Sequence, residues 1–285
     1  MIFITGSSSF VGQKLIQKLK KEKIHFIGID NNINNYSEKK MYKRNINDKI
    51  ISKLIKKNST IIHLAAISNV KDCQSNPIDT LKSNINGTIN ILDQSIKKKA
   101  KHFIFASTEW VYPNKNKVFK ENYKINIDDL DNNYSVSKLV GEEILLKFKN
   151  KIKITILRFG IIYSDRKNGG SAVESLVNSV KNSNFLKIGS KKTSRRFVHI
   201  DDIIEGIFIC YKKKVAGTFN LSGDKDITLE KIIKTSSKFL NKKIKINIEA
   251  NSKPSVRRVS NLKSKKILGW YPNININDGI KKILK

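Results

Sequence analysis

Tyr134 and Lys138 are the two residues of this chain whose types and spacing most directly suggest chemistry. Residues four apart in a helix lie on the same face, so the phenol and the ammonium group would be neighbours. A phenol has an unperturbed pKa of about 10, and a cation held beside it stabilises the phenolate. The spacing therefore predicts a tyrosine that acts as a general base nearer to neutral pH.

A second motif spans residues 5–12, with the sequence TGSSSFVG, and directly follows the apolar start MIFI. It predicts a strand, a glycine turn and a helix whose first N–H groups face a pyrophosphate. Gly6 and Gly12 suit the tight turn and the close approach of backbone, whereas Ser9 stands where a middle glycine is expected. A dinucleotide site together with a lysine-activated tyrosine predicts hydride transfer at a carbinol carbon.

Asp30 ends the second apolar run, which covers residues 25–29. An acidic residue at this place accepts hydrogen bonds from the adenine ribose hydroxyls and repels a 2′-phosphate. No arginine follows nearby, so the sequence favours NAD over NADP. The alternative is that Asp30 is only a turn residue before Asn31 and Asn32.

The elements that position these residues follow from the alternation of apolar runs and helical patterns. This alternation predicts an α/β fold, a Rossmann-type doubly wound parallel sheet with a smaller C-terminal α/β substrate-binding part. We expect an NAD-binding domain over residues 1–163, to which 197–221 return, and a substrate-binding part over 164–196 and 222–285. The predicted strands are 1–5, 24–29, 60–64, 102–106 and 153–158, and the predicted helices are 10–21, 48–56, 78–98, 131–149 and 201–213.

Further motifs extend the pattern over nearly the whole length of the chain. They are His63-Leu64-Ala65-Ala66, Asn84-x-x-Gly87-Thr88, Ser107-Thr108, Leu157-Arg158, Arg195-Arg196-Phe197-Val198-His199 and Leu268-Gly269-Trp270-Tyr271-Pro272. In this order the motifs resemble the extended short-chain dehydrogenase/reductase family, in its branch of NAD-dependent sugar-nucleotide epimerases and dehydratases. The resemblance implies a nucleotide-diphosphate sugar as substrate, a tightly held NAD and a homodimer.

The resemblance also implies roles for individual residues. Thr108, Tyr134 and Lys138 would form the catalytic set, and Arg195 would contact the substrate diphosphate, for which a guanidinium is well suited. Arg257 or Arg258 is expected as a second clamp, with a solvated face as the alternative for both. Glu109 and Thr108 complete the predicted substrate contacts. The predicted cofactor contacts are Gly6, Ser9, Phe10, Val11, Gly12, Asp30, Asn31, Leu64, Ala65, Ala66, Tyr134 and Lys138.

The residues after Thr108 distinguish branches of the family. Dehydratases typically carry Asp-Glu there, as acid and base for the loss of water, whereas this chain has Glu109-Trp110. An indole cannot accept a proton, so the elimination base is missing. The sequence therefore predicts an epimerase acting at C4 of a nucleotide-diphosphate hexose. The alternatives are a nucleotide-sugar 4-keto reductase and, behind it, a 4,6-dehydratase or a non-catalytic NAD-binding or RNA-binding protein.

The composition sets limits on partners and location. The net charge is +32 over 285 residues, but only seven of the 56 basic residues are arginine. Lys, Ile and Asn share A/T-rich codons, which accounts for the excess of lysine, so we expect no nucleic-acid partner. The sequence has no apolar run of about 20 residues, so we expect no membrane-spanning segment. Cys73 and Cys210 lack the spacing of metal ligands, so we expect no metal site. We expect both cysteines to be reduced thiols in a cytoplasmic protein.

Overall fold

The computed structural model describes residues 1–32, 40–166, 170–249 and 253–285. The chain forms two compact units, each made of three separate segments. The first unit comprises Met1–Tyr112, Lys124–Arg158 and Ile204–Phe219, and the second comprises Pro113–Tyr123, Phe159–Ile203 and Asn220–Lys285. The segments 113–123, 159–163 and 197–203, expected with the nucleotide-binding domain, thus belong to the second unit.

A seven-stranded sheet forms the centre of the first unit, in the order β12-β7-β5-β4-β1-β2-β3. β1 pairs in parallel with both β2 and β4, so the strand order reverses beside β1. This is the doubly wound arrangement in which ligands bind outside the carboxyl ends of the strands, and it confirms the predicted fold class. The strands are β1 (Ile2–Thr5), β2 (Phe26–Asp30), β3 (Met41–Lys43), β4 (Thr60–His63), β5 (His102–Thr108), β7 (Lys153–Phe159) and β12 (Gly217–Leu221).

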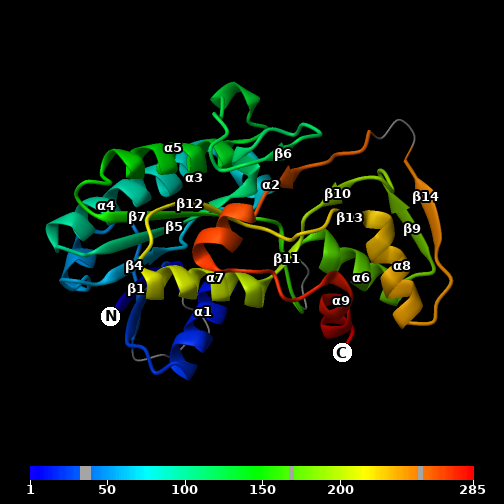
Figure 1. The fold of residues 1–285 in the computed structure, drawn as a ribbon, viewed down its shortest axis with the longest axis horizontal. Coiled ribbons are helices and arrows are strands. Elements are labelled where there is room, and N and C mark those ends of the chain that lie inside the picture. Colours follow the sequence, from blue (N-terminus) through cyan, green and yellow to red (C-terminus); the bar gives the residue numbers. More distant parts are fainter. Residues whose placement is uncertain (33–39, 167–169, 250–252) are drawn as a thin grey trace. The chain divides into compact units, whose positions relative to one another are not determined.

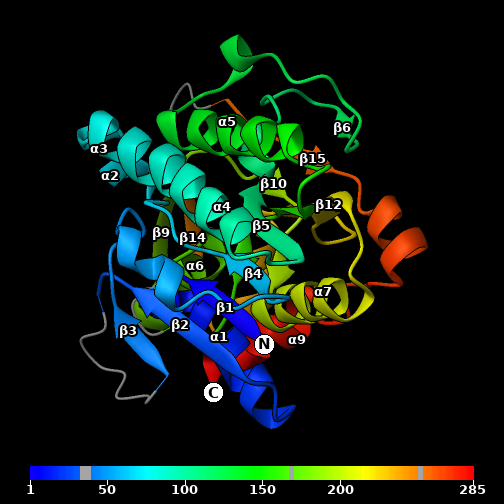
Figure 2. The same ribbon diagram turned by 90° about the vertical axis from the view of Figure 1, so that its left-hand side faces the viewer.

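Helices cover both faces of this sheet, with α4 and α5 on one face and α1 and α7 on the other (Figures 1 and 2). Apolar side chains from strands and helices, among them Phe3, Ile61, Ile91 and Phe103, are fully buried between the layers. The helices are α1 (Phe10–Lys21), α2 (Val70–Ser75), α3 (Pro77–Leu81), α4 (Gly87–Lys97), α5 (Asn133–Lys147) and α7 (Ile200–Lys213), and the shorter turns are η1 (Lys49–Lys53), η2 (Lys82–Asn86), η3 (Glu109–Val111) and η4 (Ile127–Asp129).

Two predicted helices differ from the structure. The helix expected over 48–56 is only the 3₁₀ turn η1, because the Asp48 carboxylate accepts from Asn45 N in the preceding turn and does not cap a helix. The helix expected over 78–98 is divided into α3, the π-helical turn η2 and α4.

In the parts of the second unit that the structure describes, short strand pairs lie beside the helices α6, α8 and α9. β8 pairs with β11, β9 with β14 and β6 with β15 in parallel, whereas β10 and β13 are antiparallel. Val173, Val177, Ile232 and Ile280 form much of its core. The elements are β6 (Val118–Phe119), β8 (Ile162–Tyr163), α6 (Ala172–Asn182), β9 (Phe185–Ile188), β10 (Ser194–Arg195), β11 (Val198–His199), β13 (Ile227–Thr228), α8 (Leu229–Phe239), β14 (Lys245–Ile248), β15 (Arg258–Val259), η5 (Ser264–Leu268) and α9 (Ile276–Leu284).

Asp202 anchors the C-terminal motif of the second unit. Its carboxylate accepts hydrogen bonds from the backbone N–H groups of Asn273 and Ile274, and its carbonyl accepts from the Trp270 indole at 2.7 Å. Gly269 has a φ of 67°, a left-handed conformation that favours glycine at the end of a helix. These contacts tie Asp202 to the Gly269-Trp270 segment, which is distant from it in the sequence. Within the described ranges, no helix has both the length and the apolarity needed to cross a bilayer.

Candidate active site

The glycine turn after β1 has no room for larger residues at two positions. Gly6 has a φ of 69°, and a Cβ atom there would lie 2.6 Å from the backbone N of Ala65. A Cβ at Gly12 would collide with the carbonyl oxygen of Gly6. Ser9 has an extended backbone and caps α1, accepting a hydrogen bond from Gly12 N at 3.1 Å. The missing middle glycine is therefore no defect, since that position needs no positive φ.

Polar groups at this turn fit a dinucleotide phosphate. The side-chain oxygens of Ser7 and Ser8 are buried and have no hydrogen-bond partner within the described part of the chain. They lie just before the N-terminus of α1, where backbone N–H groups and the helix dipole favour an anion. Phe10 and Val11 begin that helix and are half-buried. The turn thus offers the donors that a pyrophosphate needs.

Asp30 connects the end of β2 to the glycine turn. One carboxylate oxygen accepts from Ser8 N at 2.9 Å, and the other accepts from Asn32 N at 3.1 Å. Each oxygen keeps a second lone pair for another donor, so these contacts leave a role toward a ribose open. Asn31, the next predicted cofactor contact, is exposed.

Asn84 braces the loop that follows β4. Its side chain accepts from Ile67 N at 2.8 Å, donates to Ile67 O at 3.0 Å and donates to Ser137 Oγ on α5 at 2.9 Å. The loop begins with the half-buried residues 64–66, which are Leu, Ala and Ala. Asn84 lies in the π-helical turn η2, a distortion that frequently occurs at functional sites.

His63 is a structural histidine with a defined tautomer. Thr88 donates its only hydroxyl proton to Asn84 O at 2.6 Å, so it accepts from His63 Nε2–H at 2.9 Å. The other ring nitrogen, Nδ1, accepts from the Thr5 hydroxyl at 2.6 Å. Burial and the charge of Lys138 lower the pKa of His63 to about 3. The ring therefore stays neutral near pH 7, as expected for a packed strand-end histidine.

The three predicted catalytic residues come together in the first unit. Tyr134 and Lys138 lie one turn apart on α5, and Thr108, at the end of β5, is hydrogen-bonded to the Tyr134 phenol. The Lys138 ammonium lies 5.9 Å from the centre of the Tyr134 ring and 4.7 Å from that of Phe105. Thr108 also accepts from Trp110 N, which fixes the turn that follows β5.

The pKa values of Tyr134 and Lys138 are shifted partly by other neighbours than the sequence predicts. Desolvation raises the pKa of Tyr134, the nearby Cys73 raises it further, and the hydrogen bond with Thr108 lowers it. The contact that favours the phenolate is thus the one with Thr108, whereas the Tyr134–Lys138 spacing predicts that effect from Lys138. Burial lowers the pKa of Lys138 to about 8, although Glu142 and Cys73 oppose that shift.

The residues after Thr108 form the turn η3. Glu109 is fully buried there, and Trp110 is half-buried. Trp110, the second residue after Thr108, thus presents an indole in this turn, and an indole has no group that could accept a proton.

The two predicted arginine contacts lie in the second unit, each next to a residue of the isolated bridge between Ser194 and Val256. The Arg195 guanidinium donates to Ser194 O at 2.8 Å and to Ser255 O at 2.7 Å, so its position is fixed before any ligand binds. Arg257 is 1% exposed. It is therefore not on a solvated face, which was the alternative for this residue.

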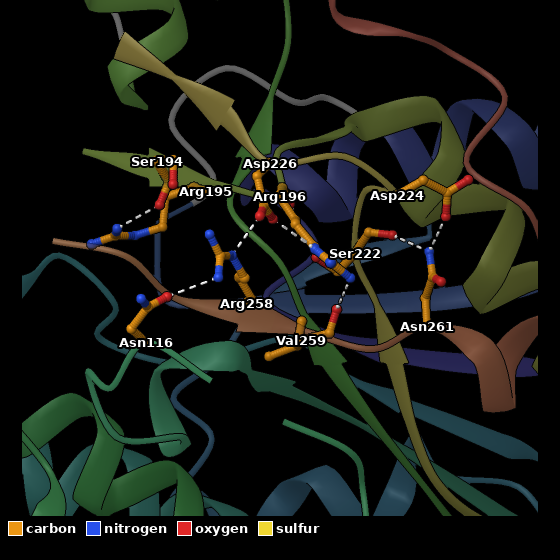
Figure 3. A network of polar contacts seen from close by, with 10 residues as sticks. All are labelled: Asn116, Ser194, Arg195, Arg196, Ser222, Asp224, Asp226, Arg258, Val259 and Asn261. Carbon is orange, nitrogen blue, oxygen red and sulfur yellow. Dashed lines mark hydrogen bonds and ion pairs between the residues drawn. The ribbon is translucent and has the colours of Figure 1, made fainter. Parts of the chain in front are cut away.

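The residues that directly follow Arg195 and Arg257 in the chain, Arg196 and Arg258, take part in an ion-pair network (Figure 3). Asp226 binds both Arg196 and Arg258, and Arg196 also donates to Val259 O at 3.1 Å. Arg258 donates further to the Asn116 side chain at 2.8 Å. The network holds strand β15 beside β10 and β13, which gives the arginine cluster a rigid base.

Sequence reasoning did not identify Glu142 and Arg158 as a pair. The Arg158 guanidinium donates to both oxygens of Glu142, with its shortest contact at 2.6 Å, and to the Tyr112 hydroxyl at 2.8 Å. Ser107, beside Thr108, donates to the same carboxylate. The sequence carries a local signal for Glu142 alone, which is four residues after Lys138 and therefore on the same helix face, and none for its pairing with Arg158.

The chain is similar in sequence and in fold to proteins named as sugar-nucleotide epimerases. The putative UDP-glucose 4-epimerase of Methanocaldococcus jannaschii is 29% identical over 306 residues, covering 100% of this chain and 97% of that protein. The UDP-glucuronate 4-epimerase of Thermodesulfobacterium geofontis is 28% identical over 305 residues, covering 98% and 93%. The UDP-glucuronic acid 4-epimerase of Bacillus cereus, solved with UDP-glucuronic acid and NAD, has a TM-score of 0.85 at 26% identity, over 99% of this chain and 96% of that one.

The family itself is identified by a sequence model. The model described as "NAD dependent epimerase/dehydratase family" matches residues 2–222, which is most of the chain. The chain therefore belongs to the NAD dependent epimerase/dehydratase family, which confirms the predicted family, the predicted class of enzyme and the predicted cofactor, NAD.

Proposed function

We propose that this protein is a 4-epimerase of UDP-hexoses, with UDP-glucose and UDP-glucuronic acid as the first substrates to test. One observation carries the proposal: Thr108, Tyr134 and Lys138 meet in the first unit, and the position of an elimination base is filled by an indole. Relatives named as UDP-glucose and UDP-glucuronate 4-epimerases support the choice of substrate and carbon.

NAD would be held by the glycine turn, Asp30 and Lys138, and it would supply reversible hydride transfer at C4. Tyr134 takes the proton of the C4 hydroxyl as the sugar is oxidised and returns it as the sugar is reduced. Thr108 holds the phenol and the same sugar oxygen in line. Lys138 carries the positive charge that balances the phenolate while the proton is away.

The substrate's other contacts are proposed for Glu109, Arg195 and Arg257. The guanidinium of Arg195 is already held by Ser255 O, which lowers the entropy cost of binding a diphosphate. Arg195→Ala should raise the Km for the UDP-sugar about 10–100-fold, because a hydrogen bond to a charged group is lost. The matched control is Arg44→Ala, which removes an exposed guanidinium that donates to the carbonyl of Lys43 in the first unit.

Product analysis tests the reaction. Purified protein is denatured to measure its NAD content, and native protein is incubated separately with UDP-glucose and UDP-glucuronic acid and followed by NMR. Stoichiometric NAD and the C4 epimer, with no net change in NAD, are the expected results. Release of CO₂ from UDP-glucuronic acid would indicate a decarboxylase, like relatives from Arabidopsis thaliana. An empty site, with stoichiometric NAD(P)H oxidation by a keto-sugar, would indicate the reductase instead.

We also propose a cytoplasmic homodimer that pairs through α4 and α5. On these helices Leu139 and Leu145 are buried, whereas Val136 and Val140 are only partly buried and Ile89 is 43% exposed. The partly exposed residues are thus free of the core and suit a symmetric contact. Sedimentation should give a species of twice the 32.5 kDa chain, and Val140→Asp should give the single chain. A 32.5 kDa species for the unaltered protein would contradict the dimer.

A further inference from the structure

Glu142 connects every element that carries a proposed catalytic residue. It lies on α5, one turn after Lys138, and its carboxylate accepts from Arg158 on β7 and from Ser107 on β5. Ser107 is the residue next to Thr108. The side chains of Glu142 and Arg158 are 1% and 7% exposed, so the pair is shielded from water.

Arg158 extends this connection to the turn after Thr108. Its guanidinium donates to the Tyr112 hydroxyl at 2.8 Å and lies 4.9 Å from the centre of the Tyr112 ring. Tyr112 directly follows η3 and is fully buried. The carboxylate thereby joins α5 to both ends of the segment that runs from Ser107 to Tyr112.

We propose that Glu142 is a positioning residue, which holds Thr108 against Tyr134 and keeps Lys138 positively charged. The proposal rests on the catalytic roles given above to these three residues. Buried ion pairs often cost as much desolvation energy as they return in attraction, so this pair needs a purpose other than stability. Fixing catalytic groups to within a fraction of an ångström is such a purpose, since a displacement of about 1 Å can cost about 10²-fold in rate.

The electrostatic half of the proposal concerns Lys138, which is 3% exposed. The titratable groups that interact electrostatically with Lys138 or lie against it are on three elements. They are Tyr134 and Glu142 on α5, Cys73 on α2 and His63 on β4. Burial lowers the pKa of Lys138 to about 8, and the negative charge of Glu142 is the larger of the two effects that raise it. Without that charge, Lys138 would lose its proton at a lower pH, and the phenolate would lose its balancing cation.

Two variants separate position from charge. Glu142→Gln keeps the shape and an acceptor but removes the charge, and Glu142→Asp keeps the charge on a shorter side chain. Glu143→Gln is the matched control, because Glu143 is exposed and directly follows Glu142 on the same helix. We expect Glu142→Gln to lower kcat about 10–100-fold with little change in the substrate Km. In a plot of activity against pH, the decline on the alkaline side should begin at a lower pH for this variant. Glu142→Asp should restore the alkaline limb, and Glu143→Gln should match the unaltered enzyme.

Loss of one partner from a buried pair can unfold a protein, so a double variant keeps the test decisive. Glu142→Leu/Arg158→Met replaces both charges by apolar groups, a change that folded proteins often tolerate. It should fold, lose most of its kcat and show the same alkaline shift. A double variant with the kcat and pH profile of the unaltered enzyme would overturn the proposal.

A measurement that needs no substrate distinguishes this proposal from the proposed function. Trace labelling with acetic anhydride at a series of pH values, read by peptide mass spectrometry, gives the titration midpoint of Lys138 in each variant. We expect a midpoint near 8 in the unaltered protein, a lower one in Glu142→Gln and no change in Glu143→Gln. Such a shift in a protein that does not epimerise UDP-sugars would refute the function alone. An unchanged midpoint in an active epimerase would refute the role of Glu142 alone.

Discussion

The Lys138 ammonium lies 5.9 Å from the centre of the Tyr134 ring, and desolvation moves the pKa values of the two groups in opposite directions. Burial raises the pKa of Tyr134 and lowers that of Lys138, so it favours the uncharged form of each. The charged pair that the reaction needs is thus supported by neighbours, Thr108 for the phenolate and Glu142 for the ammonium.

Tyr134→Phe should lower kcat about 10²–10⁴-fold, because the hydroxyl that accepts and returns the proton is removed. NAD content after purification should remain close to that of the unaltered protein, since the glycine turn and Asp30 are intact. Turnover assays and cofactor release on denaturation measure both. Activity within a few-fold of the unaltered enzyme would place the base elsewhere.

The pH profile should report the charge of Lys138. The pKa of this group is lowered to about 8, so it is a cation below that pH and loses its proton above it. We therefore expect kcat/Km to fall as pH rises through about 8. Lys138→Arg should move this limb to higher pH, since a guanidinium stays protonated there. A profile for the unaltered enzyme that stays level to pH 10 would contradict the prediction.

Asp30 can be tested for its two functions separately. Asp30→Asn keeps an acceptor for Ser8 N but loses the charge, and Asp30→Ala loses both. Each substitution should weaken NAD binding about 10–100-fold, because hydrogen bonds to a charged group are lost. Each should also reduce the ratio of the affinity for NAD to the affinity for NADP. Cofactor titration followed by calorimetry gives both affinities. If the ratio of the two affinities does not change, Asp30 serves only the turn.

His63 should make the protein less stable in mild acid. Its pKa is about 3 in the folded protein and about 6.5 when unfolded, so the unfolded state binds more protons between these values. The contribution of neutral, hydrogen-bonded His63 to the free energy of unfolding is complete above pH 6.5. It is lost progressively as the pH falls toward 3. His63→Gln should abolish about 2 kcal/mol of the stability loss between pH 7 and pH 5, measured by urea unfolding. Parallel pH curves for the two proteins would show that His63 is not responsible.

Much of the nucleotide-binding unit was predictable because its signals are local. The helix predicted over 10–21 is α1 with the same bounds, and the five predicted strands all occur in the central sheet. The strands β3 and β12 were missed because their sequences carry weak strand signals: β3 has only three residues, and β12 contains Gly217 and Asn220, residue types that are depleted in strands. The break at Asn84 was missed too, since it results from a side chain that binds the Ile67 backbone instead of solvent.

The candidate site shows the same division. The Tyr134–Lys138 spacing and the glycine turn are local sequence patterns, and the structure places Lys138 near the Tyr134 ring and Gly12 against the backbone of Gly6. Glu142 and Arg158 are sixteen residues apart and meet only when β7 pairs into the sheet. Such a pair has no local signature, because it depends on the topology that brings α5 and β7 side by side.

The division of the first unit into three segments has a consequence during synthesis. Strand β12 begins at Gly217, so a growing chain that has just completed Arg158 lacks the strand that covers the outer edge of β7. At about 5–20 residues per second, that edge would wait on the order of 3–13 s for its partner. An unpaired edge strand is a template for association with other chains. A chaperone that shields β7 on the ribosome would therefore raise the yield of this protein more than one that acts on the finished chain.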